Sequence, residues 1–199
     1  MKTLIGIVVL LSFTVLAGGA CTSSNPTGPI ATQDNSPLTT RTGIPAIDNV
    51  LAAIESDDPQ ELSAQIRYTV APCTTVDGLG GPPKCRDGEP EGTMLEVLPF
   101  LGSEGSFIRK SEIGTWNGIG GYSLYAIYRV SENAPVEEYY PSGDYAVLLV
   151  SSDGNTALSL RLGNDGIVRV DELFDGSPAT LDAILERDAS EVILAPKIR

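Results

Sequence analysis

The chain has 199 residues, of which 42% are hydrophobic, and its formal net charge is −13. This length allows one domain of ordinary size with an extension. The negative charge argues against nucleic-acid binding, which needs basic patches. The sequence contains no histidine, which excludes Ser-His-Asp and Cys-His catalysis and any zinc or haem held by histidine.

Residues 1–20, MKTLIGIVVLLSFTVLAGGA, have the three parts of a secretory signal peptide. Lys2 supplies a positive start, residues 4–16 form an apolar stretch, and residues 17–20 are small. The apolar stretch is short for a membrane span but normal for a signal core. We therefore expect export, with cleavage after Ala20.

Cys21 stands immediately after this cut, and the segment resembles a bacterial lipobox. That resemblance implies a lipid on Cys21 and attachment to the cell membrane or outer surface. The lipobox usually carries Leu, Val or Ile three places before the cysteine, whereas Gly18 stands there, so plain secretion remains the alternative. The chain has three cysteines, and lipidation of Cys21 would leave Cys73 and Cys85 as a pair.

Residues 21–40 combine this cysteine with a stretch rich in Ser, Thr, Pro and Asn. Such a composition cannot build a core and predicts a flexible linker. The folded domain is expected over residues 41–199.

The first predicted elements of this domain are helices. Apolar residues recur at helical spacing in GIPAIDNVLAAIES, with Pro45 in the first turn. A second short helix is predicted after Asp58, which can cap it, with Pro59 next.

Cys73 and Cys85 come next and flank TTVDGLGGPPK. In an oxidising compartment they are expected to pair as a disulfide, and the lack of histidine and of a CxxC spacing makes a metal site the weaker reading. The loop matches no phosphate-binding motif. The segment APCTTVDGLGGPPKCRDGEPEGT resembles a module of exported bacterial proteins of unknown activity, a resemblance that spans roughly residues 40–110.

Strand patterns dominate the rest of the chain. They are RYTVAPC, TMLEVLPF, SFIRKSEI, GYSLYAIYRV, the stretch DYAVLLVSSDGNTALSLRLGNDGIVRVDELF, and EVILAP. Asp153-Gly154 and Asp165-Gly166 divide the long stretch into three strands of an antiparallel meander. A helix capped by Ser177 is predicted in GSPATLDAILER, before the last strand.

This order of elements predicts an α+β domain with N-terminal helices packed on a curved, mostly antiparallel sheet. Residues 44–66 and the meander over 145–173 resemble the NTF2-like (cystatin-like) pattern, in which early helices pack into the hollow of a curved sheet. That superfamily contains isomerases, dehydratases and pure binding domains, so the resemblance implies no single activity.

The candidate ligand-binding residues are aromatic. Trp116, Tyr122, Tyr125 and Tyr128 cluster near Arg129, and tyrosine combines an apolar ring with a polar tip. Strict alternation along the strand places Tyr122 and Tyr128 on one face, with Tyr125 and Arg129 on the other. Ordinary core packing is the competing interpretation.

We expect a cell-envelope lipoprotein whose domain is a non-catalytic binding or interaction module for a small molecule or a protein. No metal site, cofactor or nucleic-acid partner is expected. The membrane is an expected partner, through a lipid anchor on Cys21. One alternative is an NTF2-like enzyme that uses carboxylate and tyrosine acid–base chemistry, which requires a buried carboxylate with a perturbed pKa beside Tyr122 or Tyr128. The other alternative is a structural spacer without a pocket.

Overall fold

The computed structural model describes residues 41–78, 80–102, 105–116, 118–134 and 138–196. The chain divides into two units, Met1–Asn35 and Ser36–Arg199, and the description here concerns the second. The predicted signal segment, Cys21 and the linker lie outside the described residues.

The domain is a mixed α+β fold built on a large sheet of eight strands, which confirms the predicted class. Its elements follow the order α1 (Pro45–Ser56), α2 (Pro59–Ala64), β1 (Thr69–Pro72), β2 (Met94–Leu101), β3 (Ser106–Arg109), the 3₁₀ helix η1 (Lys110–Thr115), β4 (Tyr122–Val130), β5 (Tyr145–Ser151), β6 (Ala157–Leu162), β7 (Ile167–Leu173), α3 (Pro178–Asp188) and β8 (Ala189–Leu194).

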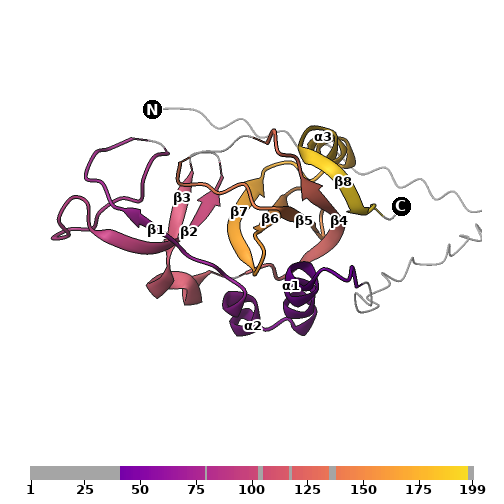
Figure 1. Ribbon diagram of the computed structural model, residues 1–199, viewed down its shortest axis with the longest axis horizontal. Coiled ribbons are helices and arrows are strands. Elements are labelled where there is room, and N and C mark those ends of the chain that lie inside the picture. Colours follow the sequence, from indigo (N-terminus) through magenta and orange to yellow (C-terminus); the bar gives the residue numbers. More distant parts are fainter. Residues whose placement is uncertain (1–40, 79, 103–104, 117, 135–137, 197–199) are drawn as a thin grey trace, which may run out of the picture. The chain divides into compact units, whose positions relative to one another are not determined.

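The strands lie in the order β1-β2-β7-β6-β5-β4-β8, and β3 pairs with β2 beside this path (Figure 1). Strands β5, β6 and β7 form the predicted antiparallel meander. Among the strand pairs of the described chain, β2 and β7 alone run parallel, and they meet over two residue pairs, Phe100↔Val170 and Leu101↔Asp171. The β1–β3 end of the sheet is therefore joined to the meander by a narrow seam.

Helices cover both faces of the central strands. Helices α1 and α2 pack on one face, where Ile47, Val50 and Leu51 are fully buried. Helix α3 packs on the opposite face through Leu181 and Ile184. The meander strands are buried on both sides for this reason, and all six residues of β6 are buried.

The helix ends match their sequence signals. Asp58 caps α2 by accepting a hydrogen bond from the Gln60 N–H at 2.8 Å, and Ser177 caps α3 by accepting from the Thr180 N–H. These contacts satisfy backbone donors that a helix N-terminus leaves free.

The predicted strand in SFIRKSEI is wrong beyond Arg109. The chain turns into η1 at Lys110, because three consecutive polar residues over 110–112 give no alternating face to bury. Ile113 of η1 packs against the core on the α1 face instead.

The predicted alternation along β4 is also wrong. Its pairing with β5 shifts register between Leu124 and Ala126, so Tyr125 is an extra residue in the strand and the side-chain pattern slips by one position. Tyr122 consequently packs with the α1-side core, whereas Tyr128 packs with the α3-side core.

Candidate functional site

The predicted aromatic residues do not come together in one pocket. Trp116 and Tyr122 pack against the α1-side core, and the Tyr122 hydroxyl lies 3.1 Å from the Thr156 hydroxyl. Tyr125, on the α3 side, donates a hydrogen bond to Asp182 of that helix at 2.8 Å. The set is split between the two faces of the sheet.

Two further members of that set have different surroundings. Tyr128 is fully buried on the α3 side, and burial raises the pKa of its phenol. Arg129 is exposed and pairs with Glu191 at 3.3 Å, beside the Tyr145 ring. Ordinary packing therefore accounts for the positions of these residues.

The predicted disulfide is confirmed: Cys73 and Cys85 are bonded. Cys73 follows directly on β1, so the bridge ties the loop between β1 and β2 to the sheet. The bridge stabilises the domain chiefly by removing conformational freedom from the unfolded chain.

Arg109 holds the second part of the same loop. Its guanidinium binds both carboxylate oxygens of Glu89, at 2.5 and 2.8 Å, and donates to the Lys84 carbonyl oxygen at 2.9 Å. Hydrogen bonds from Arg109 and from the backbone N–H of Arg86 lower the pKa of Glu89 to about 2. The loop is thus fixed to β3 by a charge pair and to β1 by the disulfide.

A hollow of about 430 Å³ opens next to this clamped loop, where β2 begins and β3 ends. Its lining residues are Met94, Leu95, Glu96, Arg109, Lys110 and Ser111. It is an open depression of the surface and not an enclosed cavity. A smaller hollow of about 50 Å³ lies between α1 and α2.

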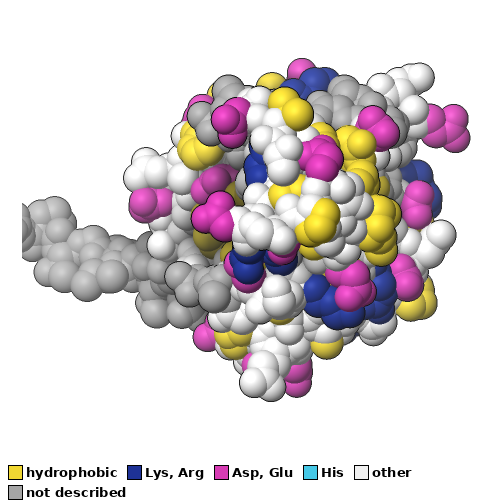
Figure 2. All heavy atoms as spheres, turned by 90° about the vertical axis from the view of Figure 1, so that its left-hand side faces the viewer, with side chains coloured by type: hydrophobic (Ala, Val, Ile, Leu, Met, Phe, Trp, Pro, Cys, Tyr) yellow, Lys and Arg dark blue, Asp and Glu magenta, His cyan; other side chains and the backbone are white. Residues whose placement is uncertain are grey.

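Exposed apolar side chains lie beside the polar residues of the larger hollow. Met94 is 61% exposed and Val70, on the neighbouring strand, is 58% exposed. The Lys110 ammonium pairs with Glu96 at 2.8 Å and lies 5.4 Å from the centre of the Tyr68 ring. Seen from this end, hydrophobic side chains lie among paired charges of both signs (Figure 2).

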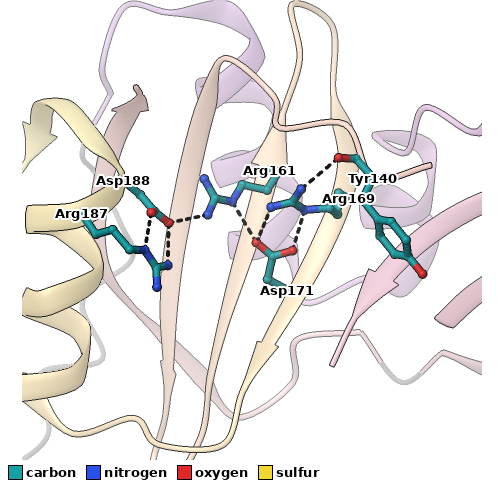
Figure 3. Close-up of polar contacts among 6 residues, drawn as sticks. All are labelled: Tyr140, Arg161, Arg169, Asp171, Arg187 and Asp188. Atoms are coloured by element: carbon teal, nitrogen blue, oxygen red, sulfur yellow. Dashed lines mark hydrogen bonds and ion pairs between the residues drawn. The ribbon is translucent and has the colours of Figure 1, made fainter. Parts of the chain in front are cut away.

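The sheet face on the α3 side contains a buried chain of charges (Figure 3). Asp171 on β7 accepts hydrogen bonds from Arg161 at 2.9 Å and from Arg169 at 2.6 and 3.0 Å. Arg161 also donates to Asp188 at 2.8 Å, and Asp188 accepts from Arg187 at 2.6 and 3.0 Å. The chain links β6 and β7 to the C-terminal end of α3.

Asp188 is the carboxylate that most nearly meets the requirement of the enzyme hypothesis. It is 2% exposed and its charge acts on the Tyr128 phenol. Burial alone would raise the pKa of Asp188, but hydrogen bonds from Arg187 and Arg161 outweigh it and lower the pKa. A carboxylate held as an anion in this way is a weak proton acceptor, and neither hollow described above is lined by it.

Sequence reasoning missed these buried charges. In β6 and β7, apolar residues alternate with Arg161, Arg169 and Asp171. Such alternation predicts a polar face of the sheet that is exposed to solvent. The available signal was the apolar stripe of α3, since a helix with Leu181 and Ile184 on one side needs a sheet face to cover.

The described residues contain no group of three or more His, Cys, Asp or Glu side chains able to hold a metal ion. None of the helices in those residues is long and apolar enough to cross a membrane. No protein-family model, no curated protein and no solved structure matches the chain.

Proposed function

We propose that the chain is an exported lipoprotein of the cell envelope, with a signal peptide over residues 1–20 and a lipid on Cys21. The observation that carries this proposal is the Cys73–Cys85 disulfide, because it suits an oxidising compartment and leaves Cys21 as the third cysteine. Residues 21–40 would act as the tether between membrane and domain. Secretion without a lipid is the alternative.

The domain itself is proposed to be a non-catalytic binding or interaction module. Support comes from the 430 Å³ hollow and the exposed side chains of Met94 and Val70 at the β1–β3 end. The neighbouring loop is held by the disulfide and by Arg109, and a rigid surface loses little entropy on binding. We expect a small molecule or a protein segment that brings an apolar group to this surface.

Charge supports the choice of partner. Each Lys and Arg in the described residues already contacts a carboxylate or a carbonyl oxygen. The surface therefore offers few cations for a phosphate backbone or an anionic headgroup. Membrane attachment would depend on the lipid alone.

The finer fold assignment, an NTF2-like arrangement, is also a proposal. It is supported by two early helices that precede the strands and by the β5–β7 meander. The α1-side face is filled by Ile47, Val50 and Leu51, which favours a binding module over an enzyme with a pocket in that face. The spacer hypothesis is disfavoured by the hollow at the β1–β3 end.

Mass spectrometry of the mature protein from its own host tests the lipoprotein proposal. We expect the mass of a diacylglycerol on Cys21 and the loss of two hydrogens across Cys73 and Cys85. The matched control is Cys21→Ser, which should lack the lipid and leave the disulfide intact. An unmodified chain that starts at Cys21 would refute lipidation and favour secretion.

Photocrosslinking in the host tests the binding surface separately. A photoreactive amino acid replaces Met94 in one strain and Val192 in another, since Val192 is also exposed (45%) but lies on β8. We expect adducts from position 94 and none from position 192. Equal labelling at both positions, or none at 94, would contradict the assignment of this surface.

A further inference from the structure

Strand β2 is paired unevenly along its two sides. On one side it pairs with β1 and, further along, with β7. On the other side it pairs with β3, which ends at Arg109, opposite Val97. Val97 pairs with both β1 and β3, and Phe100 pairs with both β3 and β7, so β3 lies alone on its side. In the described part of the chain, residues 94–96 therefore have a strand partner on the β1 side only.

The backbone groups of Met94 and Glu96 point to the side of β3. In an antiparallel ladder the N–H and C=O of one residue face the same neighbouring strand, and successive residues alternate between the two neighbours. The Thr93 carbonyl faces β1, since it accepts a hydrogen bond at 2.8 Å from the N–H of the residue that follows β1. The Phe100 carbonyl faces β3, since it accepts from the Ser106 hydroxyl at 3.2 Å. Odd-numbered residues of β2 therefore bond to β1, and even-numbered residues face the side of β3.

The larger hollow lies in the space beyond the end of β3. It is lined by residues 94–96 of β2 and by residues 109–111, where the chain leaves β3 and turns into η1. A strand placed there would continue the line of β3 and would meet the N–H groups of Met94 and Glu96 and the Met94 carbonyl. Such a row of backbone groups at a sheet edge is a template for an added strand.

We propose that this edge binds a short, uncharged, extended peptide segment, which adds to β2 as a strand in line with β3; this inference rests on the binding surface proposed above and names its partner. Main-chain hydrogen bonds to Met94 and Glu96 would supply the affinity. The Met94 side chain, which is 61% exposed, would select an apolar residue at the neighbouring position of the added strand.

The charges around the hollow favour an uncharged segment. Glu96 pairs with Lys110 at 2.8 Å, and Arg109 pairs with Glu89 at 2.5 Å. A charged ligand would have to separate one of these pairs to gain a partner, whereas the main chain of a peptide leaves both pairs intact.

A second copy of the chain fits this edge less well. The net charge of −13 opposes self-association. In a two-fold dimer the same patch of both copies meets, and two equal recesses cannot fill each other. An extended segment is narrow enough to enter the recess from solvent.

Amide hydrogen exchange of the full chain tests the open edge without any ligand. The amides of Leu95 and Val97 face β1, whereas those of Met94 and Glu96 face the hollow. We expect exchange at Met94 and Glu96 to be at least about tenfold faster than at Leu95 and Val97. Equal protection of all four amides would overturn the proposal, because the edge would then be covered within the domain.

Two synthetic peptides, added to the isotope-labelled full chain, test strand addition itself. The probe is acetyl-Thr-Val-Thr-Val-Thr-amide, and the matched control is the same peptide with methylated backbone nitrogens, which keeps the side chains and lacks the N–H donors. At about ten times its Kd, the probe should slow exchange at Met94 and Glu96 about tenfold, and the control should not. Equal protection by both peptides, or by neither at millimolar concentration, would overturn the proposal.

Glu96→Pro separates strand addition from the proposed binding surface. Proline removes the N–H that faces the hollow and is tolerated where a strand N–H bonds to no neighbouring strand. We expect the variant to keep the amide protection of Leu95 and to bind the probe at least about tenfold more weakly. Photocrosslinked adducts at position 94 that persist in the Glu96→Pro chain would overturn strand addition and leave the proposed surface intact. A doubled mass in light scattering that Glu96→Pro abolishes would also overturn it, because a second copy would then occupy the edge.

Discussion

Asp171 is the carboxylate on which the buried charge chain depends most, and Asp171→Asn should destabilise the domain strongly. The substitution keeps the shape of the side chain and removes its charge. Arg169 then loses its sole carboxylate partner in the described structure, and Arg161 keeps Asp188. Because both guanidiniums stay buried, at 6% and 7% side-chain exposure, water cannot replace the lost carboxylate.

The expected cost is about 3–5 kcal/mol, the usual penalty for breaking a buried ion pair from one side. A domain is stable by about 5–15 kcal/mol, so the variant should lose a large share of its stability. With a slope of about 2 kcal/mol per M, the midpoint of urea unfolding should fall by about 1.5–2.5 M.

The matched control is Asp165→Asn, which breaks the exposed pair with Arg67 at 2.9 Å. The two side chains are 40% and 70% exposed, and Asn-Gly supports the same hairpin turn as Asp-Gly. Exposed pairs contribute about 0–1 kcal/mol, so the midpoint should fall by less than about 0.5 M. Equal shifts for both variants would refute the argument from burial.

Three more predictions concern other parts of the domain. Replacing both disulfide cysteines by serine should cost about 3 kcal/mol and lower Tm by about 6–12 °C in a calorimetric scan; an unchanged Tm would contradict this. Burial and the hydrogen bond with Asp182 raise the pKa of Tyr125 to about 12. The protonated phenol therefore stabilises the folded state below about pH 10, and this contribution is lost as the pH rises toward 12. In an absorbance titration, the Asp182→Asn variant should show a Tyr125 pKa closer to the ordinary value of a phenol. A titration curve identical to that of the unaltered protein would count against the Tyr125–Asp182 hydrogen bond. A Cβ atom on Gly166 would clash with the Gln65 carbonyl oxygen, so Gly166→Ala should lower the free energy of unfolding, measured in urea, by about 1–3 kcal/mol. A Cβ atom on Gly114 has no atom within contact distance, so Gly114→Ala should leave this free energy unchanged.

Local signals in the sequence were sufficient to predict many elements of the fold. The meander followed from Asp-Gly turns between alternating strands, and α2 and α3 from Asp58 and Ser177 at their caps. The disulfide followed from the cysteine count. Each of these features depends on residues close together in the chain or on simple pairing.

Other features depend on contacts between distant segments and could not be read from local patterns. The bulge in β4 is one extra residue, Tyr125, and alternation alone does not reveal it. The buried positions of Arg161 and Asp171 depend on α3 covering that face. The hollow beside Met94 arises where β2 and β3 extend past the helices, and no motif marks it.

The seam between β2 and β7 has a consequence for how the domain opens. Two residue pairs join these strands, and the strands are far apart along the chain, so their pairing requires closure of a long loop. Strands β5, β6 and β7, by contrast, are linked by short turns and pair along most of their length. In native-state hydrogen exchange, backbone amides of β1–β3 should therefore become exposed as one cooperative unit before those of the meander do.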